Sequence, residues 1–234
     1  VEATVKQILA LEQAGCQVVR LAIPDMAAAQ AIPAIKKQIH IPLVADTHFD
    51  HRLALEALKG GIDKIRINPG NIGEKANVKA VADACKAAGV PIRVGVNSGS
   101  VDADLREKYG VTPETLCQAA LRNLEQLEDC GFYDTCVSLK MSNVFGTIQA
   151  YRLMAQKCDY PLHLGVTEAG NEHFGTLRSA AAFGGLLCDG IGDTMRVSLT
   201  ADPVREIYAA KDILKALDLH TGGARIVSCP TCGR

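Results

Sequence analysis

Short apolar runs rich in β-branched residues alternate along this chain with longer segments of helical periodicity. Such alternation is typical of repeated β/α units around a parallel sheet. We expect seven strands, at residues 17–23, 43–49, 64–68, 92–97, 135–141, 162–167 and 195–199. We expect helices at residues 2–14, 26–39, 51–59, 75–88, 113–130, 144–157, 174–187 and 203–217.

These units and a length of 234 residues fit one barrel-sized α/β domain. The first helical segment has no strand before it. Seven parallel strands leave two unpaired edges, whereas eight close the cylinder. We therefore predict a TIM (β/α)8 barrel whose first strand lies upstream of Val1, so that the sequence is a fragment of a longer protein. A flavodoxin-like open sheet is the alternative, but no glycine-rich dinucleotide fingerprint follows the first expected strand.

The composition argues against several functional classes. Hydrophobic residues make up 48%, charged residues 22%, and the formal net charge is -1, which favours a soluble protein that binds neither nucleic acid nor membrane. The apolar stretches are too short to span a bilayer. The nine cysteines are mostly scattered singly, which indicates a reducing compartment rather than a disulfide framework. We expect a cytoplasmic location.

Cations interrupt five of the expected strands, namely at Arg20, Arg66, Arg93, Lys140 and Arg196. Both faces of a parallel sheet are covered, so a charge within such a strand is costly unless something neutralises it. Residues two apart on a strand share a face, and the partners at this spacing are small or polar: Asn68, Gly95, Asn97, Ser142 and Ser198. They lie toward the carboxyl ends, where barrel enzymes gather their sites. The pattern predicts a cationic pocket for a small phosphorylated anion.

Two acidic residues also belong to the expected strand ends, Asp46 and Glu168. Internal salt bridges to these carboxylates are the plainer interpretation of the cations, but two acids cannot balance five positive charges. Glu168 follows Thr167 at the pocket rim and is our candidate proton donor or acceptor. Asp46 and His48 share a strand end, where the carboxylate could orient the imidazole.

Cys229 and Cys232 form the one close cysteine pair of the sequence. Two thiolates at this spacing can hold one edge of a zinc ion or of an iron–sulfur cluster, or act as a dithiol, and the motif does not choose between them.

Several longer motifs carry a resemblance to a known family. They are PLVADTHF at 42–49, KIRINPGNIG at 64–73, PIRVGVN at 91–97, YPLHLGVTEAG at 160–170, GIGDTMRVSLT at 190–200 and SCPTCGR at 228–234. In these motifs the chain resembles the 4-hydroxy-3-methylbut-2-enyl diphosphate synthases, iron–sulfur reductases of the methylerythritol phosphate route to isoprenoids. The resemblance implies a substrate-binding barrel, at residues 1–222, and the beginning of a C-terminal [4Fe–4S] domain, at residues 223–234.

The resemblance also implies roles for individual residues. The barrel would bind 2-C-methyl-D-erythritol 2,4-cyclodiphosphate, and the cluster domain would deliver two electrons that open the ring with loss of oxygen. The residues implied to bind substrate are Arg20, Arg66, Asn68, Arg93, Asn97, Lys140, Thr167, Arg196 and Ser198, together with Ser142 or Asn143. Asp46 and His48 would support the pocket, and Glu168 would handle protons near the reacting carbon.

Cys229 and Cys232 resemble the first two of three cysteine ligands of the cluster, the fourth ligand being a glutamate. The third cysteine, this glutamate and the first strand are absent from the sequence, so the fragment is expected to bind substrate without turning it over. The family implies a homodimer, in which one subunit's cluster domain caps the other's barrel, and flavodoxin or ferredoxin as electron donor. A pterin-binding barrel of the dihydropteroate synthase type and a non-enzymatic anion-binding module are the rival functions.

Overall fold

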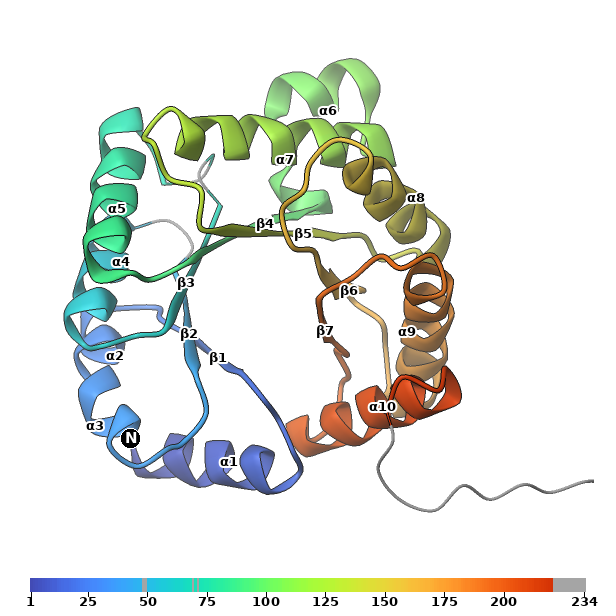
Figure 1. Ribbon diagram of the computed structural model, residues 1–234, viewed down its shortest axis with the longest axis horizontal. Coiled ribbons are helices and arrows are strands. Elements are labelled where there is room, and N and C mark those ends of the chain that lie inside the picture. The colour runs from blue at the N-terminus through green and yellow to red at the C-terminus, as the bar shows by residue number, and fades with distance from the viewer. Residues whose placement is uncertain (48–49, 69, 71, 221–234) are drawn as a thin grey trace, which may run out of the picture.

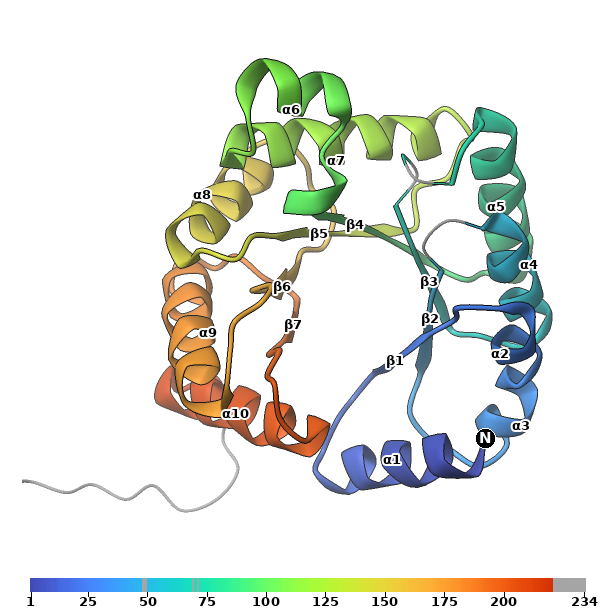
Figure 2. The same cartoon turned by 180° about the vertical axis from the view of Figure 1, so that it is seen from behind.

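The computed structural model describes residues 1–47, 50–68, 70 and 72–220. Within these ranges the chain forms a ring of strands surrounded by helices (Figures 1 and 2). The strands are β1 (Val19–Ala22), β2 (Leu43–Asp46), β3 (Lys64–Ile67), β4 (Ile92–Asn97), β5 (Thr135–Lys140), β6 (His163–Gly165) and β7 (Thr194–Arg196). Each expected strand is confirmed, with ends within about three residues of the expectation.

The helices cover the outside of the ring (Figure 1). They are α1 (Glu2–Gln13), α2 (Met26–Gln30), α3 (Ile32–Lys36), α4 (His51–Lys59), α5 (Lys75–Ala88), α6 (Ala103–Tyr109), α7 (Pro113–Glu128), α8 (Val144–Ala155), α9 (Glu172–Leu187) and α10 (Pro203–Ala216). A 3-10 turn, η2, spans Ser98–Ser100. In the described ranges, none of the helices is both long enough and apolar enough to cross a bilayer.

All strand pairs are parallel, in the order β1-β2-β3-β4-β5 in one sheet and β6-β7 in another. A single parallel bridge between Val137 and Leu162 joins the two sheets. At the other side of the ring α1 lies beside α10, and the Lys211 ammonium donates to the Ala14 carbonyl (Figure 1). The eighth strand that we expect before Val1 stays a prediction.

The apolar core lies between the strands and the helices. On β4, Ile92 and Val94 are fully buried toward the helices, while the alternate residues Arg93 and Asn97 face the interior of the ring. Helix α7 closes over this strand, and its start is fixed by a capping box between Thr112 and Thr115. Strand alternation thus sends apolar side chains outward and polar ones inward.

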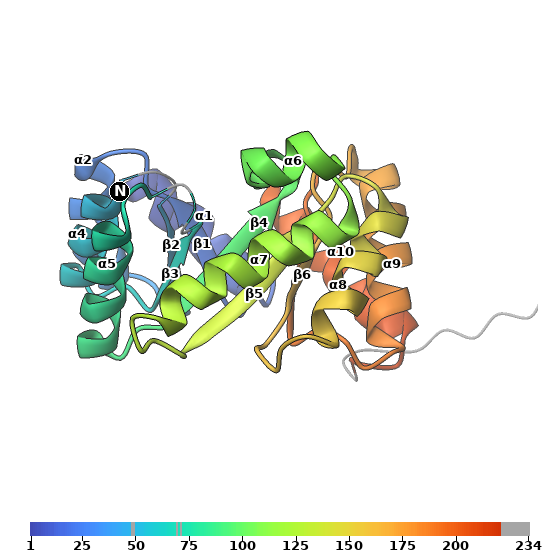
Figure 3. The same ribbon diagram turned by 90° about the horizontal axis from the view of Figure 1, so that it is seen from above.

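The helices differ from the expectation in two places. The single helix expected at residues 26–39 is two short helices, α2 and α3, because Pro33 lacks the N–H that would continue the ladder and lies in the first turn of α3. Helix α6, in the connection between β4 and α7, was not expected at all. It lies at the end of the ring where β4 finishes (Figure 3), and Leu105 is its one buried residue.

Candidate anion site inside the strand ring

A cavity of about 200 Å³ lies inside the ring of strands. Six strands contribute to its wall directly and β6 does so through Thr167, two residues beyond its end. The lining residues are Arg20, Asp46, Arg66, Arg93, Val96, Asn97, Ser138, Lys140, Thr167 and Arg196. All five cations predicted from the strand pattern are among them. A more open depression of about 530 Å³ lies on the outer face of α7 beside Glu125 and Glu128, but it lacks this convergence of charge.

Asp46 is the one carboxylate in the cavity wall as described, and it joins two of the cations. Its Oδ2 lies 2.8 Å from Arg20 Nη1, and its Oδ1 lies 2.9 Å from Arg66 Nη1. Asp46 and Arg66 are both buried, so this pairing is shielded from water. The Arg66 Nη2 atom also donates to the Gly95 carbonyl over 3.3 Å. Asp46 therefore orients guanidinium groups.

The other three cations have no carboxylate partner among the described residues. Arg93 Nη1 lies 3.4 Å from Ser138 Oγ, and Arg196 Nη2 donates to Ser198 Oγ over 2.7 Å. The buried Nε of Arg196 has no hydrogen-bond partner in the described ranges. An ion pair or hydrogen bond of Lys140 is likewise absent from the described part of the chain. The interior thus holds more positive charge than its own acids balance.

This excess charge depresses the pKa values of the interior groups. Burial, with the positive charges of Arg20 and Arg66, lowers the pKa of the Arg93 guanidinium to about 10. Burial lowers the pKa of the Lys140 ammonium well below its usual value, and Arg93 and Arg196 lower it further. His163, at the start of β6, also has a strongly lowered pKa because of burial and the same cations. A bound anion would relieve this repulsion.

Two glycines leave room for these cationic side chains. A Cβ on Gly95 would lie 2.6 Å from Arg66 Nε, and a Cβ on Gly165 would lie 2.7 Å from Lys140 Cε. Real Cβ atoms do not approach other heavy atoms so closely, so any larger residue would displace the cation. These positions fix how Arg66 and Lys140 cross the interior.

Glu168 lies exposed just after the end of β6, outside the wall of the cavity. Its φ of 55° is in the left-handed region, which residues other than glycine adopt at a cost of about 1 kcal/mol or more. Strained backbone of this kind concentrates at functional sites. The position of Glu168 beyond the carboxyl end of β6 agrees with the expected rim, and its role stays a prediction.

Several predicted residues lie outside the cavity wall. Asn68 is buried just beyond β3. Ser198 does not line the cavity but accepts a hydrogen bond from Arg196, which does. Ser142 and Asn143 are exposed, and Asn143 Oδ1 caps α8 by accepting from the Gly146 N–H over 2.5 Å. This cap occupies the side-chain oxygen of Asn143.

Three predicted residues, His48, Cys229 and Cys232, lie outside the described residues. In the ranges that are described, three or more His, Cys, Asp or Glu side chains nowhere gather as a metal ion would require. The seven cysteines described there are free thiols. The described part therefore offers no ligand set for a cluster.

The sequence interpretation missed Ser138, Val96 and Asn123. Ser138 could have been found, because it shares a strand face with Lys140. Val96 is apolar, so its sequence position gave no indication that it lines the cavity. Asn123 lies in the middle of α7, and only its contacts with a distant loop reveal its significance.

Known proteins match this chain in sequence and in fold. The sequence model of a protein family, described as the GcpE TIM-barrel domain, matches residues 1–211. Two proteins named 4-hydroxy-3-methylbut-2-en-1-yl diphosphate synthase (flavodoxin) are similar over the whole chain. The one from Caldanaerobacter subterraneus subsp. tengcongensis is 55% identical, and the one from Fusobacterium nucleatum subsp. nucleatum is 57% identical. The chain spans 66% of the length of each.

A solved dihydropteroate synthase from Thermus thermophilus shares the fold, with a TM-score of 0.64 over 92% of this chain and 89% of that one. At 14% identity this likeness concerns the fold alone. It does not favour the pterin-binding alternative, whereas the sequence match extends over nearly the whole chain and confirms the predicted barrel class. The chain belongs to the GcpE TIM-barrel domain family.

Proposed function

We propose that the strand ring is the substrate-binding domain of a 4-hydroxy-3-methylbut-2-enyl diphosphate synthase, and that its cavity binds the diphosphate of 2-C-methyl-D-erythritol 2,4-cyclodiphosphate. The observation that carries this proposal is the charge of the cavity wall, which holds five cations and one carboxylate. A diphosphate offers several oxygens to arginine forks and to the Lys140 ammonium at once.

The proposed reaction breaks a ring C–O bond to phosphate and removes one hydroxyl as water, consuming two electrons and two protons. Negative charge grows on the phosphate oxygen as the ring opens, and Arg93, Lys140 and Arg196 face the cavity with no carboxylate of their own in the described ranges. Pre-oriented cations in a water-poor interior stabilise such developing charge. Glu168, at the rim, is our proposed proton donor to the departing hydroxyl.

The electrons would come from a [4Fe–4S] cluster that Cys229 and Cys232 help to ligate, in a second domain that begins near residue 223. The names of the relatives support flavodoxin as electron donor, with ferredoxin as the alternative. A homodimer and a cytoplasmic location also stay proposals.

The remaining predicted residues keep proposed roles in this site. Asn68, Asn97, Thr167 and Ser198 would donate hydrogen bonds to the diphosphate, and His48 would support the pocket. Of the pair Ser142 and Asn143, the capping bond uses the side-chain oxygen of Asn143 and leaves its NH2 group, so both residues stay proposed donors to the substrate.

The test uses the intact protein, prepared without oxygen and supplied with reduced flavodoxin and the cyclic diphosphate. We expect phosphorus NMR to show conversion to a linear diphosphate, and Glu168→Gln to slow turnover far more than it weakens substrate binding. A protein that turns over a pterin diphosphate instead, or one that binds the cyclic diphosphate equally well after Arg93→Met, would contradict the proposal.

The cluster has its own test. We expect broad visible absorption after anaerobic reconstitution with iron and sulfide, and its loss in Cys229→Ser. A colourless protein that turns over a pterin diphosphate would overturn the cluster and favour the pterin-binding alternative.

A further inference from the structure

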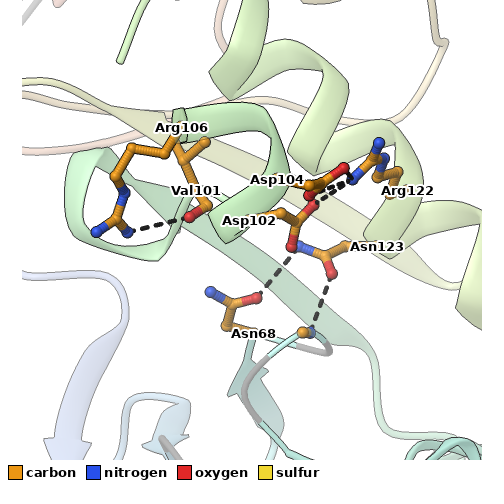
Figure 4. Close-up of polar contacts among 8 residues, drawn as sticks. Asn68, Val101, Asp102, Asp104, Arg106, Arg122 and Asn123 are labelled. Atoms are coloured by element: carbon orange, nitrogen blue, oxygen red, sulfur yellow. Dashed lines mark hydrogen bonds and ion pairs between the residues drawn. The ribbon is translucent and has the colours of Figure 1, made fainter. Parts of the chain in front are cut away.

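Asn123 is a buried polar residue on α7, within a helix face that is otherwise mainly apolar. Its side chain bridges to the segment that follows β3. The Asn123 Nδ2 atom donates to Asn68 Oδ1 over 3.2 Å, and Asn123 Oδ1 accepts from the Gly70 backbone N–H over 3.0 Å (Figure 4). Helix α7 is thereby linked to the loop at the carboxyl end of β3.

These two bonds determine which way both amide side chains face. A backbone N–H can only donate, so the oxygen of Asn123 must point to Gly70 and its NH2 group must point to Asn68. Asn68 must then offer its oxygen to Asn123. Its own NH2 group is left on the opposite side. The orientation of Asn68 therefore follows from an unambiguous backbone donor.

The Nδ2 atom of Asn68 is buried and has no hydrogen-bond partner within the described ranges. It points away from Asn123 (Figure 4). Asn68 directly follows the carboxyl end of β3, two residues after Arg66, which lines the cavity. A buried donor without an acceptor is destabilising, and a ligand oxygen would supply the missing hydrogen bond.

We propose that Asn123 is a positioning residue of the anion site, which acts by holding Asn68 with its NH2 group, rather than its oxygen, toward the bound anion. This inference rests on the proposed diphosphate function of the cavity. Reversal of the Asn68 amide would turn a carbonyl oxygen toward a phosphate, replacing an attraction by a repulsion.

Contacts next to Asn123 hold α7 against the connection that precedes it. The neighbouring Arg122 pairs with Asp102 over 3.2 Å and with Asp104 over 2.9 Å, which ties α7 to the connection from β4 (Figure 4). In the same connection Arg106 donates to the Val101 carbonyl over 3.0 Å.

The decisive variant is Asn123→Asp. Its carboxylate still accepts from the Gly70 N–H but cannot donate, so it draws the NH2 group of Asn68 toward itself and turns the Asn68 oxygen to the site. With inorganic pyrophosphate as probe and calorimetry on the intact protein, we expect affinity to fall at least tenfold in Asn123→Asp and severalfold in Asn123→Ala. Gln118→Glu, the same chemical change on the exposed face of α7, should bind like the wild type.

Two further readouts separate positioning from general stability. The side-chain NH2 resonance of Asn68 should shift with pyrophosphate in the wild type and not in Asn123→Asp. In an Asn68→Ala background, Asn123→Asp should cause no additional loss of affinity, because its effect passes through Asn68. If Asn123→Asp does not fold, the same cycle is run with Asn123→Ala.

If Arg93→Met still weakens pyrophosphate binding, then wild-type affinity in Asn123→Asp, or an undiminished loss in the Asn68→Ala background, would overturn the positioning role alone. If the wild type itself fails to bind pyrophosphate, the anion site is absent and both proposals fall together.

Discussion

The two faces of the same strands behave in opposite ways. Toward the helices, residues such as Ile92 and Val94 are fully buried among other apolar groups and need nothing further. Toward the interior, Arg93 on the same strand is buried beside other cations and keeps a depressed pKa. The apolar outer layer stabilises the fold. The buried cations of the interior destabilise it as long as no anion is bound. Substitutions on the two faces should therefore have opposite consequences.

The largest effect is expected from the outer layer. Leu116 on α7 is fully buried, and Leu116→Ala should lower the free energy of unfolding by about 2–5 kcal/mol through lost burial and a residual cavity. Denaturant unfolding measures the loss, and pyrophosphate affinity below the transition should stay at the wild-type level. A large loss of affinity in the folded variant would show that the two faces are not independent.

The opposite pattern is expected from the interior. Arg93→Met should weaken pyrophosphate binding by about 1.5–3 kcal/mol, because a charged hydrogen bond is lost. The free energy of unfolding should be unchanged or higher, since a buried cation is replaced by apolar volume. Calorimetry and denaturant unfolding on the same samples test both halves. A loss of both stability and pyrophosphate affinity in Arg93→Met would contradict this separation between the two faces of the strands.

A smaller effect is expected where the interior leaves room for a cation. Gly165→Ala brings a Cβ against the end of the Lys140 side chain, which is flexible and can move. We expect a severalfold loss of pyrophosphate affinity and little change in stability. The control is Gly184→Ala in α9, where the nearest contact of the new Cβ is 3.9 Å and the helix should gain up to about 1 kcal/mol. Equal pyrophosphate affinities in Gly165→Ala and Gly184→Ala would show that Gly165 does not contribute to the anion site.

The smallest effect is a proton linked to binding. The folded chain holds the pKa of Lys140 well below 10.5, so the unfolded chain binds this proton more tightly and stability rises with pH from the lowered pKa up to 10.5. A bound anion raises that pKa again, so binding within this interval should take up a proton. Calorimetry in buffers of different ionisation heat measures the uptake. Lys140→Met should abolish it, and persistence of the uptake would assign the proton to another group.

Much of the fold followed from periodicity. The strands and the longer helices were predicted because each repeats an apolar pattern over enough residues to be distinctive. The split between α2 and α3 depended on one proline, and α6 escaped notice because Leu105 is its one buried residue. Short elements with little burial are determined by their neighbours rather than by their own sequence.

The site likewise contains residues that the sequence pattern predicted and residues whose roles depend on distant neighbours. A cation inside an apolar strand is unusual enough to be found by inspection, and period-two alternation assigned all five to one face. The role of Asn123 could not be found in this way, because its hydrogen-bond partners lie 53 and 55 residues away along the chain. The exposure of Ser142 and the capping bond of Asn143 likewise depend on how α8 begins.

The sequence by itself determined that strands and helices alternate and that five cations share the interior, because both properties are written in residue spacing. Tertiary structure alone decided which cations Asp46 pairs with and which keep no carboxylate in the described part of the chain. It also decided which way the Asn68 amide faces. These outcomes depend on distances of about 3 Å between atoms of different strands and helices, and no local pattern encodes such distances.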